Sequence, residues 1–118
     1  MKSTVLVLLF LLLSPYAEPE IKLTVRPLIQ SAPGEVRIEY RISRHPDNRE
    51  YEISWSDEAG KLGSHRSSLD GDNEPALFPS IYLEDLGPGQ YVTEGVVKRI
   101  VGGKIKEYKT RQPFEVLR

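Results

Sequence analysis

The sequence of 118 residues contains no cysteine at all. Disulfide bonds, zinc–thiolate sites and a lipid-modified N-terminal cysteine are therefore excluded, and the fold must be stabilised by its apolar core alone. A large excess of charge of one sign is also missing, because 16 Lys and Arg stand against 17 Asp and Glu. Without a basic excess, the composition predicts no nucleic-acid partner.

Long apolar runs are missing as well. The longest, at 5–13, has nine residues, whereas a membrane-spanning helix needs roughly 20. It follows Lys2 and precedes the small residue Ala17, which is the pattern of a secretory signal peptide. We therefore predict a helical signal peptide at 1–17, cleaved after Ala17, then a linker at 18–20 and one domain at 21–118. The predicted location is secreted or periplasmic. An uncleaved anchor is the alternative, and would be the only membrane contact.

Beyond residue 20, no stretch repeats its apolar residues at helical spacing. Apolar and polar residues alternate instead, most clearly at 36–42 and 51–55, as they do in half-buried strands. Further strands are predicted at 21–26, at 62–69 and at 77–83. The second of these is rich in Ser and suits a sheet edge, and the third is interrupted by Pro79. Residues 30–34 are predicted to form a loop.

The stretch 83–105 organises the rest of the chain. Pro88, between Gly87 and Gly89, permits a sharp turn from one sheet to the other. Tyr91 follows, where a Tyr can bury its ring and return its hydroxyl to the upstream backbone in a tyrosine corner.

The dipeptide Gly102-Gly103 then predicts a two-residue hairpin turn, which fixes the register of the flanking strands. Two opposite-charge pairs face each other in that register. The predicted cross-strand pairs are Val101 with Lys104, Ile100 with Ile105, Lys98 with Glu107, Val97 with Tyr108, Glu94 with Arg111 and Tyr91 with Phe114.

Seven short strands at even spacing predict an all-β fold, a seven-stranded antiparallel Greek-key sandwich. Trp55 on the third strand, with Pro88, Gly89 and Tyr91 at the corner, resembles the immunoglobulin-like and fibronectin type III-like β-sandwiches of exported bacterial proteins. The resemblance implies a buried Trp55, and binding or spacing work rather than chemistry. The chain carries Tyr40 where many fibronectin type III domains place Trp, so the subfamily stays open.

Candidate catalytic and metal-binding groups are few. No nucleophile motif accompanies His45 or His65, so we predict no enzyme and no catalytic residue. The acidic run 70–74 places oxygens at alternating positions, but Pro75 and Ile81 stand where a calcium-binding EF-hand loop needs Gly and Glu. No metal or cofactor is therefore predicted. A calcium- or carbohydrate-binding accessory module remains an alternative, although the aromatic residues are expected mostly in the core.

A protein-contact surface is the remaining prediction. The hairpin register points four aliphatic side chains away from the core, interleaved with charged ones. An apolar row on an outer face can mark a binding site, although scattered aliphatics are also normal on strands. A bulge near Gly95 would turn some of them inward. The predicted partner surface consists of Val92, Val96, Lys98, Ile100, Ile105 and Lys109.

We thus predict an exported, non-enzymatic binding or structural module. It would contact a protein partner through the hairpin face, or through the end loops at 44–49 and 102–103. The alternative is an exported hydrolase inhibitor that presents the same loops.

Overall fold

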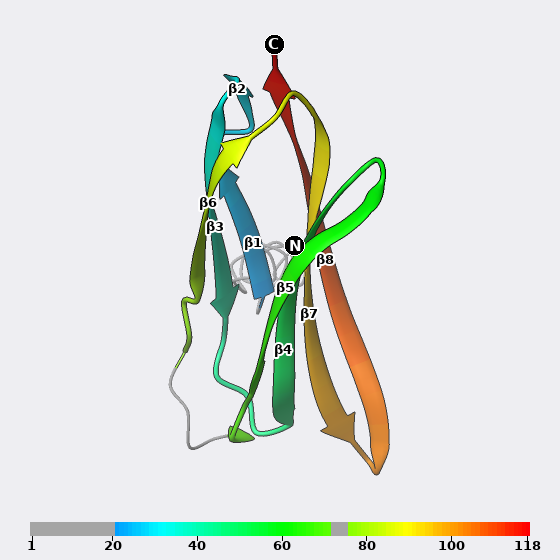
Figure 1. The fold of residues 1–118 in the computed structure, drawn as a ribbon. Coiled ribbons are helices and arrows are strands. Elements are labelled where there is room, and N and C mark those ends of the chain that lie inside the picture. Colours follow the sequence, from blue (N-terminus) through cyan, green and yellow to red (C-terminus); the bar gives the residue numbers. More distant parts are fainter. Residues whose placement is uncertain (1–20, 72–75) are drawn as a thin grey trace, which may run out of the picture.

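A computed structural model describes residues 21–71 and 76–118. The predicted signal-peptide helix and linker, and residues 72–75 of the acidic run, lie outside the described residues. The fold is all-β, and no helix of the described part is long and apolar enough to cross a membrane. Its strands are β1 (Ile21–Arg26), β2 (Ile29–Ser31), β3 (Gly34–Ile42), β4 (Asn48–Asp57), β5 (Gly60–Ser68), β6 (Ser80–Leu86), β7 (Gly89–Val101) and β8 (Lys104–Leu117), all shown in Figure 1.

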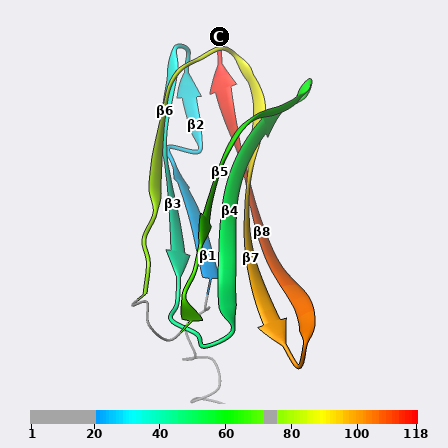
Figure 2. The same ribbon diagram turned by 60° about the horizontal axis from the view of Figure 1, so that its bottom comes forward.

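The strands form two sheets that pack as a sandwich. The first has the order β1-β3-β6 and the second the order β2-β8-β7-β4-β5. Two of the crossings between the sheets lie at opposite ends of the sandwich, the β6–β7 corner near the C-terminus and the β3–β4 loop at the far end (Figure 2). The long hairpin of β7 and β8 therefore runs the length of the molecule.

The predicted strand count was one too low for the described residues. Part of the stretch predicted as a loop at 30–34 belongs to β2, which pairs in parallel with the last residues of β8. All other strand pairs are antiparallel. A strand of three residues shows no periodicity of its own, so only its partner reveals it.

The core lies between the two sheets and is centred on Tyr40. In β3 every second side chain is buried, as the alternation predicts. The Tyr40 ring lies against Gly95 of β7, where an added Cβ would come within 2.6 Å of the ring. The bulge considered near Gly95 is absent, because β7 pairs with β8 without a register shift from Gly89 to Val101. Gly95 instead makes room for an aromatic ring from the opposite sheet.

Trp55 differs from the buried Trp that the resemblance implied. It is half-buried at the margin of the core, and its ring covers Gly63 of β5, where an added Cβ would lie 2.5 Å from the ring. The end of the β4–β5 hairpin swings away from the three-stranded sheet in both views (Figures 1 and 2), which leaves this end uncovered. Among the aromatic residues that the structure describes, Tyr40 is the one that is fully buried.

The corner before β7 has the geometry of a tyrosine corner. The Tyr91 hydroxyl donates a hydrogen bond of 2.6 Å to the carbonyl of Gly87, and the Tyr91 ring stacks on Phe114 with centroids 5.0 Å apart. Burial, and to a smaller extent the negative charge of Asp57, raises the pKa of Tyr91. Of the two glycines that flank Pro88, Gly89 has a positive φ, 156°, and Gly87 does not, while Asp85 adopts a left-handed φ of 55°. Pro88 is exposed and Gly89 half-buried.

Candidate functional site

The β7–β8 hairpin forms in the predicted register. Gly102 and Gly103 have φ values of 58° and 79°, as the two-residue turn requires. Each predicted cross-strand pair is confirmed, from Val101 with Lys104 at the turn to Tyr91 with Phe114 at the corner. The hairpin is therefore a continuously paired ribbon that holds its turn in a defined position.

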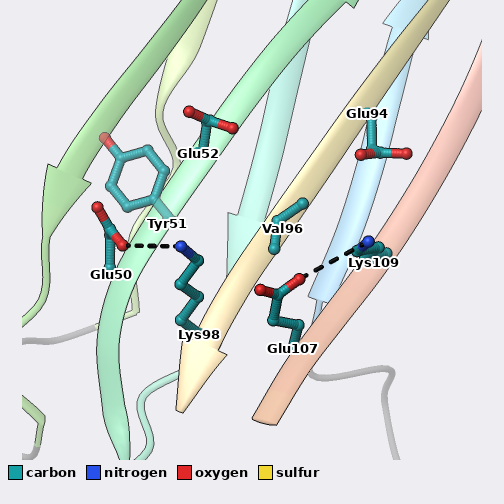
Figure 3. Close-up of a pocket in the computed structure, with 8 residues that line it drawn as sticks. All are labelled: Glu50, Tyr51, Glu52, Glu94, Val96, Lys98, Glu107 and Lys109. Carbon is teal, nitrogen blue, oxygen red and sulfur yellow. Dashed lines mark ion pairs between the residues drawn. The ribbon is translucent and has the colours of Figure 1, made fainter. Parts of the chain in front are cut away.

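The ion pairs of the hairpin differ from the predicted ones. Lys98 lies 3.5 Å from Glu50 of β4, and Glu107 lies 3.7 Å from Lys109 of its own strand (Figure 3). The backbone register was right, but β4 supplies a carboxylate that the hairpin sequence alone does not reveal. Partly exposed pairs of this kind contribute little to stability.

Charged side chains, rather than a row of apolar ones, cover the outer face of the five-stranded sheet. Val96 points outward as predicted, but it is only 8% exposed and lies at the floor of a shallow recess of about 180 Å³. Val92 is half-buried. The side chains that line the recess besides Val96 are Glu50, Tyr51, Glu52, Glu94, Lys98, Glu107 and Lys109 (Figure 3). Of the predicted partner surface, the exposed aliphatic part is therefore confined to the residues nearest the turn.

The hairpin tip, which we define as Ile100, Val101 and Ile105, carries that exposed apolar part. Ile100 and Ile105 face each other across the ribbon and are 42% and 70% exposed. Val101, which the sequence did not single out, is 41% exposed. Lys104 and Lys106 are exposed beside them. The tip thus combines aliphatic and cationic groups on a protruding turn.

Arg99 anchors the hairpin just before the tip. It is 3% exposed, its Nε donates a hydrogen bond of 2.8 Å to Oδ1 of Asn48, and its guanidinium lies over the Tyr108 ring, 4.8 Å from the centroid. The Ile100 amide also donates to the carbonyl of Asp47 at 3.1 Å. The two end loops predicted as an alternative contact region, 44–49 and 102–103, therefore lie at the same end of the sandwich. We call this the hairpin end.

The opposite end of the sandwich, the corner end, has an acidic and apolar character. Leu28 and Ile29 are 46% and 64% exposed there, and they line a recess of about 230 Å³ together with Gln90, Pro113, Phe114 and Glu115. Register places Asp57 opposite Tyr91 and Glu115 opposite Gln90. The sequence placed these aliphatic residues in or beside a loop and therefore gave no signal for this surface.

Most of the described aromatic residues lie in or against the core, as expected, but two side chains are exposed. Phe78 is 64% exposed beneath the Arg41 guanidinium, which lies 5.8 Å from its ring centroid. Tyr82 is 56% exposed and donates a hydrogen bond of 2.8 Å to Glu35. This bond raises the pKa of Tyr82. Tyr82 belongs to β6, an edge strand of the three-stranded sheet, and its side chain lies on the outer face of that sheet.

Both His residues make local contacts. The Tyr51 hydroxyl and His65 Nε2 lie 3.1 Å apart, and the Asp47 amide donates to Nδ1 of His45 at 3.1 Å. In residues 21–71 and 76–118, no group of three or more His, Asp or Glu is placed to hold a metal ion. Of the acidic run, only Asp70 and Gly71 belong to the described residues.

Comparison with known proteins gives a likeness of fold. No family model matches the chain, and no curated protein does. A superoxide reductase (neelaredoxin) from Ignicoccus hospitalis is similar in structure, with a TM-score of 0.58 at 14% identity over 83% of this chain and 80% of that one. A variant of that enzyme gives 0.53 at 15% identity, over 88% and 85%. At such identities the likeness extends to the β-sandwich fold alone.

Proposed function

We propose that this chain is an exported, immunoglobulin-like binding module that catalyses no reaction and contacts a protein partner through its hairpin tip. The observation that carries the proposal is the exposure of Ile100, Val101 and Ile105 on a protruding turn. Protein interfaces typically place apolar side chains at the centre of the contact and polar groups at its rim. Lys104 and Lys106 would form such a rim.

The anchoring of the tip supports the same proposal. The buried Arg99 and its bond to Asn48 hold the ribbon immediately before the exposed residues. A contact surface that is ordered before binding loses less conformational entropy when the partner arrives. The charged outer face is less suited to an apolar contact, because Val96 is covered and Lys98 and Lys109 lie beside carboxylates.

Cross-linking from a single introduced cysteine tests this proposal, since the chain has none of its own. Lys104→Cys, labelled with a photoactivatable group, places the probe beside the tip. Ser64→Cys on β5 is the matched control, because it is exposed and distant from the turn. We expect a protein adduct from position 104 in the exported fraction, none from position 64, and loss of the adduct when Ile105→Asp is added. Equal adducts at both positions, or adducts that Ile105→Asp leaves intact, would contradict the proposal.

A further inference from the structure

We infer that a second copy of this chain is a partner of the hairpin tip, and that the tip is received by the acidic corner end of that copy. The inference rests on the proposed function, because it names an occupant for the same tip. It is carried by the complementary chemistry of the two ends of one molecule.

The basic and aliphatic side chains of the hairpin end are complementary to a partner surface that is acidic and partly apolar. Between residues 98 and 109 the chain has five basic side chains and one carboxylate, Glu107, although its net charge is only −1. Of these, Arg99 is buried, and Lys98 and Lys109 lie beside Glu50 and Glu107. Lys104 and Lys106 are the exposed cations at the tip itself. Such a concentration of positive charge attracts a negatively charged surface and repels another copy of itself.

The corner end offers that surface. Six carboxylates gather around the β6–β7 corner and the neighbouring turns, against the three basic residues Lys61, Arg111 and Arg118, and Arg111 lines a recess there together with Asp57 and Glu58. Pairing of Gly34 with Leu86 and of Asp57 with Tyr91 brings these segments together. The recess beside Leu28 and Ile29 adds an apolar depression to the same end. The carboxylates are Glu35, Asp57, Glu58, Glu84, Asp85 and Glu115.

The length of β7 requires two molecules for this contact. The strand has 13 residues from the corner to the tip, and at about 3.3 Å per residue it spans roughly 40 Å. A chain therefore cannot fold its own tip into its own recess. Two copies joined head to tail leave one tip and one recess free, so the contact is heterologous and can extend to further copies.

An anionic lipid surface is the competing occupant for a basic, apolar tip. The order of residues disfavours it, because Lys104 lies at the turn itself while the most exposed aliphatic residue, Ile105, lies one position behind it. Insertion into lipid would bring the charge in ahead of the apolar pair. The corner end of a second copy can accept both the lysines and the aliphatic side chains of the tip, and Lys104 need not enter an apolar medium.

Sedimentation velocity of the full chain tests the inference. The contact is small, so association is expected in the range from about 10 μM to about 1 mM. The mean mass should rise with concentration and fall when salt is raised to about 1 M, where the Debye length is about 3 Å. Ile105→Asp in the tip, and separately Ile29→Lys in the recess, should each weaken self-association at least tenfold. Ser64→Asp, in the middle of β5, should associate as the natural chain does.

Mixing the two defective variants gives the decisive result. The tip variant keeps an intact recess and the recess variant keeps an intact tip, so an equimolar mixture should form a dimer of one copy of each and nothing larger. The inference is overturned if the natural chain stays monomeric, if the mixture stays monomeric, or if the tip binds phosphatidylglycerol vesicles without any self-association. A monomeric chain that still gives a hairpin-dependent adduct with another protein would overturn self-association and support the proposed function. A monomeric chain without such an adduct would overturn both.

Discussion

The tyrosine corner makes the sharpest prediction for stability. Tyr91→Phe removes the hydroxyl that donates to the Gly87 carbonyl at 2.6 Å, while the ring can keep its stacking on Phe114. One intramolecular hydrogen bond contributes about 0.5–1.5 kcal/mol. Because Gly87 is exposed, its carbonyl can accept from water instead, so we expect a loss of about 1 kcal/mol. In a domain of this size that lowers Tm by roughly 4–8 °C.

Urea unfolding and thermal melting measure this loss, with Tyr82→Phe as the matched control. The Tyr82 hydroxyl also donates a hydrogen bond, to Glu35 at 2.8 Å, but it does so on an exposed sheet face. We expect Tyr91→Phe to lower the urea midpoint at an unchanged m-value and Tyr82→Phe to leave it where it was. An unchanged midpoint for Tyr91→Phe, or an equal fall for both variants, would refute a structural role for the corner.

The same hydroxyl predicts a dependence on pH. Burial raises the pKa of Tyr91 above its ordinary value of 10.0, so the folded state favours the protonated phenol. That contribution is complete below pH 10 and is lost as the pH rises through the folded-state pKa. A phenolate also cannot donate to Gly87. The difference in unfolding free energy between the natural chain and Tyr91→Phe should therefore shrink above pH 10.

The remaining predictions concern the core and the tip. Gly95→Ala should cost about 1–3 kcal/mol, because its Cβ would lie 2.6 Å from the Tyr40 ring, whereas Gly87→Ala, with nothing within 4 Å, should change the urea midpoint little. Burial raises the pKa of Tyr40 to about 12, with the Thr110 hydroxyl opposing the rise. Stability should therefore fall between pH 10 and 12, and Tyr40→Phe should reduce that fall in unfolding titrations. Ile105→Asp should leave Tm within about 2 °C of its original value, because the side chain is 70% exposed. A larger drop in Tm would show that Ile105 stabilises the folded domain and is not simply a contact residue.

Much of the fold could be predicted because local chemistry fixes it. Gly102 and Gly103 both adopt positive φ, which selects the two-residue turn and thereby each pair along the ribbon. The alternation in β3 likewise predicts its buried face. β2 escaped prediction because three residues carry no period, and its partner lies more than 80 positions away in sequence.

The candidate site was predicted only in part, because exposure depends on neighbours that the hairpin sequence does not contain. Val96 faces outward as the register requires, but Glu52 of β4 lies beside it and long charged side chains cover it. Arg99 occupies an inward-facing position that alternation would assign to an apolar residue, and its contacts with Asn48 and Tyr108 explain how a charged side chain can lie there. The exposed Leu28 and Ile29 had no signal at all, since their surface is formed by distant parts of the chain.

We propose that the two ends of this sandwich are contact surfaces for each other. A dilution series followed by two-dimensional amide NMR tests it most directly, because each backbone resonance reports on its own surroundings. As the protein concentration rises, the account predicts that residues 100–106 and residues 28–29 with 115–117 shift together and along one common curve. Shifts confined to β5 or to the outer face of the three-stranded sheet, or no shifts at either end, would contradict it.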